Sequence, residues 1–115
     1  MSLLGQLIAK EEGFYVQGSV PQRNDNPGDL EHAPGETHSG SAIGSFSDAD
    51  AGWQALERQL QLYAERGLTL SQAIYEFAPP SENNSAAYLA FVCKGLGCTP
   101  GITMTEALQI GAQNG

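Results

Sequence analysis

A long polar stretch rich in glycine and proline separates the helical patterns of this sequence, and it limits the possible folds more than any other feature. The stretch covers residues 17–46 and holds three of the six prolines. Its tripeptide Asn26-Pro27-Gly28 is typical of a turn, because proline fixes φ and glycine permits a positive φ. Loops of this length in small domains are usually functional or contain short strands. The stretch therefore predicts an irregular or β lobe, with residues 42–46 as one strand of a small hairpin.

The residues before this stretch predict a helix over 2–13. Ser2 is a suitable N-cap, and Gly13 is a suitable end. Apolar residues recur between them with helical spacing, at Leu3, Leu4, Leu7 and Ile8. The predicted helix delivers two adjacent carboxylates, Glu11 and Glu12, to the edge of the polar stretch.

The strongest helical pattern follows the stretch, over residues 48–66. Ser47 or Asp48 caps its start, and Gly67 closes it. Large apolar residues recur along it at three- and four-residue steps and predict a face in the core. These residues are Trp53, Leu56, Leu60 and Tyr63.

Two capping boxes, Thr69–Gln72 and Thr103–Glu106, predict helix starts in the last part of the chain. The helix after the first box ends at Pro79-Pro80. Between the boxes, a further helix begins within Asn83-Asn84 and ends at Gly95. The large residues expected in the core of these helices are Ile74, Phe77, Tyr88, Phe91 and Val92.

Length and charge indicate one acidic globular domain. With 115 residues, of which 41% are hydrophobic, we expect a single domain over 1–115 with 17–46 as a lobe within it. Five Lys and Arg residues stand against thirteen Asp and Glu residues, for a formal charge of −8. This balance argues against binding to nucleic acid, where cation–phosphate contacts supply most of the affinity. It also argues against anionic membrane surfaces.

The sequence offers neither a membrane span nor a secretory leader. No apolar run reaches the roughly 18 residues of a span. The first residues lack a basic leader, and Lys10 and Glu11 interrupt the apolar run after Ile8. We therefore expect synthesis in a cytoplasm without a signal peptide.

Histidines and cysteines do not indicate a metal site or a disulfide framework. The pairs His32 and His38 and Cys93 and Cys98 lack the spacing of zinc ligands. Cys93 falls on the apolar face of its helix, where a buried thiol is expected. We expect no metal and no cofactor.

Four motifs occur in order: Glu12–Phe14, Arg23–Leu30, Ala51–Leu56 and Phe77–Asn83. Together they resemble a family of small lysozyme-like, lytic-transglycosylase-like proteins of bacteriophages and prophages. Some members are described as virion structural proteins and others as peptidoglycan hydrolases. The resemblance covers about residues 3–100. It implies a mostly α, α+β fold of the lysozyme type, a helical bundle with a small irregular or β lobe after the first helix.

The resemblance also implies a catalytic residue, because the general acid of lysozyme-like folds is a glutamate near the end of the first long helix. Glu12, directly before Gly13 and Phe14, matches that place. On a helical wheel Glu11 lies nearer the middle of the apolar stripe, so Glu11 remains the alternative. Ordinary hydrolysis also needs a second carboxylate, whereas in a lytic transglycosylase the substrate's own acetamido and 6-hydroxyl groups complete the reaction. Candidates for the second carboxylate are Asp25, Asp29 and Glu82.

Six residues of the motifs and their surroundings are candidates for binding the glycan: Asn24, Asn26, Asp29, Glu82, Asn83 and Tyr88. Simple structural roles compete with binding for most of them. Asn24 and Asn26 also suit turn formation, and Glu82 suits a helix N-terminus. Many proteins of the family carry asparagine in place of Asp25, and that change adds a negative charge near the expected cleft.

Two functions follow. The first is glycosidic cleavage of peptidoglycan glycan strands by an enzyme of the lytic transglycosylase or muramidase type. The alternative is a non-catalytic lysozyme-like protein of a phage or prophage, structural or glycan-binding, with other virion proteins as partners. The acidic charge and Asp25 favour this alternative. In either case we expect action at the cell wall after release or as part of a virion.

Overall fold

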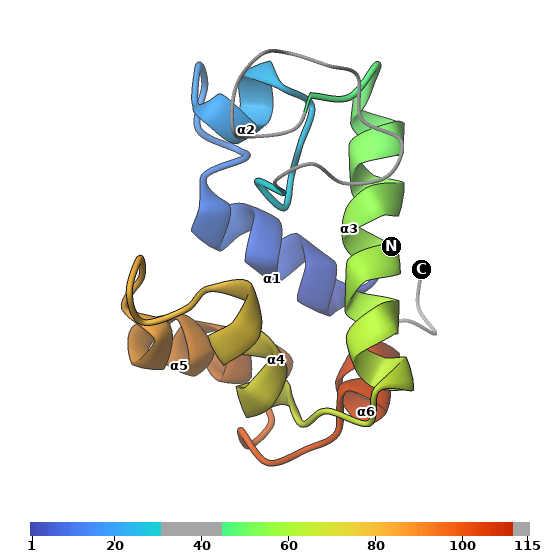
Figure 1. The fold of residues 1–115 in the computed structure, drawn as a ribbon, viewed down its shortest axis with the longest axis vertical. Helices are drawn as coiled ribbons and strands as arrows, with labels where there is room; N and C mark the ends of the chain where they lie inside the picture. Colours follow the sequence, from blue (N-terminus) through green and yellow to red (C-terminus); the bar gives the residue numbers. More distant parts are fainter. Residues whose placement is uncertain (31–44, 112–115) are drawn as a thin grey trace. The chain divides into compact units, whose positions relative to one another are not determined.

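The computed structural model describes residues 1–30 and 45–111, which are mostly helical (Figure 1). Strand structure is almost absent from these residues, and Thr69 and Thr103 form an isolated antiparallel bridge. The mostly helical class predicted from the sequence is therefore confirmed. Of the predicted hairpin strand, residues 42–44 lie outside the described residues. The helices are α1 (Leu3–Glu12), α2 (Val20–Arg23), α3 (Ala49–Glu65), α4 (Leu70–Phe77), α5 (Ser85–Leu96) and α6 (Met104–Gln109).

The chain divides into two compact units. The first unit contains Met1 and Gly5–Gln59, and the second contains Ser2–Leu4 and Leu60–Gly115. Each unit has its own buried apolar residues. In the first unit they are Ile8, Ala9, Phe46, Ala55 and Leu56, and in the second they include Leu4, Leu60, Tyr63, Leu70, Ile74, Tyr88, Leu89, Val92, Leu96 and Met104.

A glycine ends α1, as the sequence predicts. Gly13 has a φ of +86°, a conformation that costs glycine little because it has no Cβ. Its N–H donates to the carbonyl of Lys10 at 3.1 Å, and the N–H of Phe14 donates to Ala9 at 2.9 Å. This pair of bonds is a Schellman motif, which satisfies two of the last carbonyls of the helix. The motif fixes the direction in which the chain leaves α1.

The short helix α2 lies inside the stretch that the sequence predicts to be irregular or β. Ser19 is its N-cap, and the Ser19 hydroxyl accepts the N–H of Gln22 at 3.3 Å. Pro21 stands in the first turn, where its missing N–H is harmless. The Ser19 hydroxyl also donates to the carbonyl of Gly13 at 2.7 Å, which ties the start of α2 to the end of α1. Ser-Val-Pro-Gln is a helix-start signal that the prediction overlooked.

Both ends of α3 follow from its sequence. The carboxylate of Asp48 accepts the N–H of Ala51 at 2.9 Å, so Asp48 rather than Ser47 provides the cap. After the last turn, Gly67 takes a φ of +73°. The predicted helix over 48–66 is therefore confirmed to within a residue at each end.

In the second unit, both predicted capping boxes are present, and they lie against each other. The hydroxyl groups of Thr69 and Thr103 each accept the backbone N–H of the residue three positions later. The side chain of that residue in turn accepts the backbone N–H of the threonine. Between the two caps, the N–H of Leu70 donates to Ile102 at 2.8 Å and that of Met104 donates to Leu68 at 2.9 Å. The starts of α4 and α6 are thus joined through their backbones.

The end of α5 differs from the prediction. The helix passes through Gly95 to Leu96, and Gly97 with a φ of +71° closes it. Glycine in a helix interior costs only about 1 kcal/mol relative to alanine, so Gly95 does not stop the helix. At the start, Asn84 rather than Asn83 is the cap and accepts the N–H of Ala87.

The predicted core aromatics separate into two groups. Tyr63 and Tyr88 are buried, each with 4% of its surface exposed. Trp53, Phe77 and Phe91 are only half-buried, so the prediction that they are core residues was wrong. Three- and four-residue spacing identifies a face of a helix but not how completely that face is covered.

The tightest contact in the first unit involves Gly52 of α3. A Cβ atom added there would overlap the carbonyl oxygen of Asp25 and lie 2.8 Å from Cδ of Pro27. The loop after α2 therefore lies directly on the α3 backbone at a position that only glycine allows. Two motifs separated in the sequence, Arg23–Leu30 and Ala51–Leu56, meet at this point.

We predict that Gly52→Ala destabilises the protein by about 3 kcal/mol, because the added methyl group meets backbone rather than a movable side chain. The measurement is a urea unfolding curve followed by circular dichroism. Gly101→Ala is the matched control, since a Cβ there has no neighbour within 4 Å. A Gly52→Ala midpoint equal to or above that of the parent would contradict the close contact.

Candidate functional site

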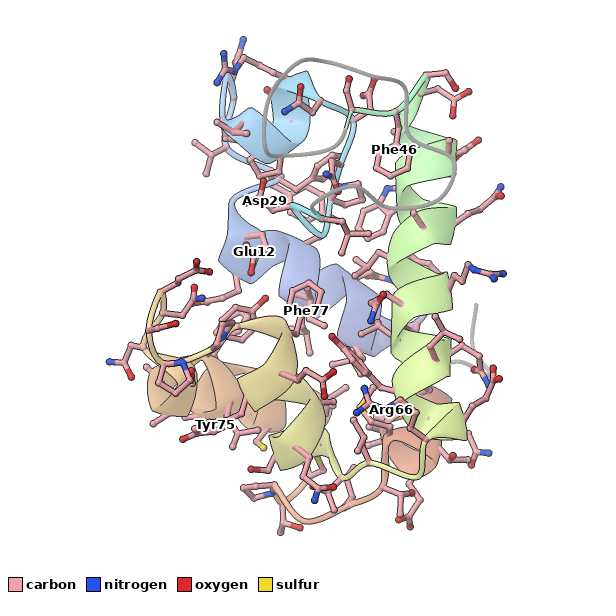
Figure 2. The ribbon with its side chains drawn as sticks, viewed as in Figure 1. Glu12, Asp29, Phe46, Arg66, Tyr75 and Phe77 are labelled. Atoms are coloured by element: carbon pink, nitrogen blue, oxygen red, sulfur yellow. The ribbon has the colours of Figure 1, made fainter. Side chains whose placement is uncertain are left out.

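The two adjacent glutamates at the end of α1 have different surroundings. Glu12 is the last residue of the helix and is half-buried, whereas Glu11 is exposed. Figure 2 shows the Glu12 side chain at the end of α1. The Schellman motif at Gly13 fixes this end, so the position of Glu12 is set by backbone hydrogen bonds. Burial helps a carboxyl to act as a general acid, and Glu12 is the more buried of the two glutamates.

Three aromatic rings form a cluster in the first unit. Phe14 and Tyr15 follow Glu12 closely in the sequence, and Trp53 lies on α3. The ring of Phe14 meets Tyr15 and Trp53 edge to face, with both centroid distances 5.4 Å. The ring centroids of Tyr15 and Trp53 are 6.5 Å apart. Tyr15 is 59% exposed, so the cluster offers ring surface to solvent. Phe14 and Tyr15 are close to each other in the sequence, but the spacing within α3 could not show that Trp53 joins them.

Asn26 holds the loop after α2 together. Its side chain is fully buried, with 0% exposed, and its Nδ2 donates to the carbonyl of Leu30 at 2.8 Å. The N–H of Leu30 returns a bond to Oδ1 at 2.9 Å. Both ends of the amide are thus used inside the loop, which is the turn-forming role weighed for this residue. The structure therefore gives Asn26 a positioning role.

The positive φ expected at Gly28 occurs instead at two aspartates of the same loop. Asp25 has a φ of 50° and Asp29 a φ of 51°, whereas Gly28 lies outside this region. Asparagine and aspartate tolerate the left-handed conformation better than other residues with a side chain. Gly28 is needed for space, because a Cβ there would lie 2.8 Å from Cδ1 of Leu56.

The predicted site residues lie in both units. Glu12, Asn24 and Asp29 are half-buried in the first unit, where one carboxylate oxygen of Asp29 is buried (Figure 2). In the second unit Glu82 and Asn83 are exposed in the turn before α5. Tyr88 is also in the second unit and is buried, so its ring is part of the core there. The candidate acid and the Asn24–Asp29 loop thus belong to the same unit.

A hollow on the first unit was not anticipated from the sequence. Asp50, Trp53, Gln54 and Glu57 lie on one face of α3 and, with Met1, line a cavity of about 360 Å³. Their spacing of three, four and seven residues was the signal that could have revealed this face. Glu12 is not among the lining residues. The combination of an indole ring, an amide and two carboxylates suits a polar ligand that has one flat apolar face.

Within residues 1–30 and 45–111, no three His, Cys, Asp or Glu side chains come together as a metal site would require. His32 and His38 lie outside this part of the chain. In the same described ranges, no helix has both the length and the apolar character needed to cross a bilayer.

Comparison with known proteins adds no relative, since no family model, no curated protein and no solved structure matches the chain. The lysozyme-like assignment therefore rests on the four sequence motifs. The contact at Gly52 brings two of them together within the first unit.

We predict that Asn26→Ala lowers the free energy of unfolding by about 2–3 kcal/mol, because both hydrogen bonds to Leu30 are lost beside a buried position. The measurement is urea unfolding. Asn24→Ala is the control, since the backbone carbonyl of Asn24, which accepts the N–H of Phe46 at 2.9 Å, remains in that variant. Equal losses for the two variants would show that the Asn26 side chain does not hold the loop.

Proposed function

We propose that this protein cleaves peptidoglycan glycan strands, with Glu12 as the general acid. The half-buried position of Glu12 at the fixed end of α1, beside an exposed Glu11, is the observation that carries the proposal. A general acid must carry a proton before it reacts, and burial of a carboxyl favours its neutral form. The order of the four motifs supports the same assignment.

The acid's task is to protonate the glycosidic oxygen as the bond breaks. If the reaction is hydrolysis, a second carboxylate acts as nucleophile or as the base for water. Asp25 and Asp29 are the candidates that share the first unit with Glu12. If the reaction is transglycosylation, the 6-hydroxyl of the muramoyl residue closes the ring and Glu12 is sufficient. The product therefore identifies the mechanism.

We predict that Glu12→Gln abolishes the release of soluble muropeptides, with a fall of at least about 100-fold, the lower range for loss of a positioned general acid. The measurement is mass spectrometry of products from purified peptidoglycan of several wall types. A 1,6-anhydro end, which is one water lighter than a reducing end, would indicate transglycosylation, and a reducing end would indicate hydrolysis.

Glu11→Gln is the matched control, because it removes the same charge one residue earlier from an exposed position. We expect it to retain most of the parent's activity, and circular dichroism should show both variants folded. Loss of activity in Glu11→Gln alone would assign the acid to Glu11. No product from the parent protein on any wall type would refute the cleavage proposal.

A second candidate function is glycan binding without cleavage, as a lysozyme-like component of a phage or prophage particle with other virion proteins as partners. The observation that favours it is the aromatic cluster of Phe14, Tyr15 and Trp53, which shares Trp53 with the hollow on α3. A sugar ring has apolar C–H faces that stack on an aromatic ring and hydroxyl groups that bond to carboxylates and amides. The formal charge of −8 also distinguishes this chain from basic wall lysozymes.

We predict that Tyr15→Ala weakens co-sedimentation with purified peptidoglycan by about tenfold, which corresponds to ~1.4 kcal/mol. Val16→Ala is the control, since Val16 is the next residue, is 61% exposed and carries no ring. Binding by the parent without any released product would favour this function over cleavage. Equal binding by the two variants would exclude the aromatic cluster as the glycan-binding surface.

A further inference from the structure

Two cysteines meet at the end of α5. Cys93 lies in the last turn of the helix, and Gly97, with its φ of +71°, turns the chain back immediately before Cys98. The N–H groups of Gly97 and Cys98 both donate to the carbonyl of Cys93, at 2.8 and 3.1 Å. The bond from Cys98 to Cys93 spans six residues, as in a Schellman motif, where the side chains at these two positions are frequently in contact.

The backbone bond limits how far apart these two residues lie. With standard bond lengths on either side of the 3.1 Å contact, the Cα atoms of Cys93 and Cys98 are at most about 7 Å apart. Disulfide-linked residues have Cα atoms roughly 4.4–6.8 Å apart. The upper limit on the Cα separation is thus within a few tenths of an ångström of the range for bridged cysteines, so a disulfide requires little movement of the backbone.

Both thiols are free and both are half-buried, so each is open in part to a reagent in solution. Burial raises the pKa of the Cys98 thiol, and the neighbouring Cys93 raises it further. Because the Cys93 thiol affects the pKa of the Cys98 thiol, the two sulfur atoms, and not only the two backbones, lie near each other.

We propose that Cys93 and Cys98 form a reversible intramolecular disulfide, which makes the end of α5 a site of thiol modification. The oxidant is a small disulfide such as oxidised glutathione. One cysteine thiolate attacks a glutathione sulfur, a mixed disulfide forms and one glutathione thiolate leaves. The second cysteine thiolate then attacks the protein sulfur of the mixed disulfide and displaces the second glutathione. Two protein thiols are oxidised to one disulfide, and one glutathione disulfide is reduced to two thiols.

The test is a redox titration of the native protein with reduced and oxidised glutathione, with the products trapped by iodoacetamide and read by mass spectrometry. We expect a product that has lost two hydrogen atoms and carries neither glutathione nor alkyl groups. Proteolysis should then yield one cross-linked peptide that contains both cysteines. Cys93→Ser and Cys98→Ser are the matched variants, and each should stop at the mixed disulfide.

The same titration in concentrated urea separates the effect of the fold from that of sequence proximity. We expect the effective concentration of one thiol toward the other to be at least about tenfold higher in the native protein. A native value equal to or below the value in urea would overturn the proposal, as would a parent protein that accumulates mixed disulfides or cross-linked dimers. Because the pKa of Cys98 is raised, the rate of alkylation of Cys98 in Cys93→Ser should continue to increase above the pH at which an ordinary thiol levels off. This site does not depend on the proposed glycan cleavage.

Discussion

The close approach of Gly52 to the backbone of Asp25 and the ring of Pro27 is the constraint on which the first unit depends. It holds the loop after α2 against α3 at a separation that no side chain permits. Two left-handed aspartates, Asp25 and Asp29, bend the loop around this point, and the Asn26 side chain closes it. Gly28 is then free to approach Leu56. The loop therefore combines close backbone approach and internal hydrogen bonds with the burial of Pro27.

Much of the helical framework could be predicted from the sequence, because the signals are local. Thr69 and Thr103 open their helices through bonds within four residues, and Gly13 and Gly67 close theirs with positive φ values. The end of α5 could not be predicted in the same way. Gly95 and Gly97 are only two residues apart there, and the path of the chain determines which of them adopts a positive φ and ends the helix.

The candidate site could be predicted less completely. The motif around Glu12 predicted the candidate acid at the end of α1, but the difference in exposure between Glu11 and Glu12 depends on packing that spacing does not record. The aromatic cluster joins Phe14 to Trp53, which are far apart in the sequence, so it required the fold. The positive φ values at Asp25 and Asp29 could not be predicted, because the sequence offers Gly28 in the same loop as the usual residue for that conformation.

The shared start of α4 and α6 has a consequence for how the second unit opens. The N–H of Leu70 and that of Met104 are each bonded to the residue before the other helix's cap, and Thr69 pairs with Thr103 between them. Neither helix can fray from its N-terminal end without breaking backbone bonds to the other. The first turns of the two helices therefore form one cooperative unit, whose amide hydrogens exchange with solvent together.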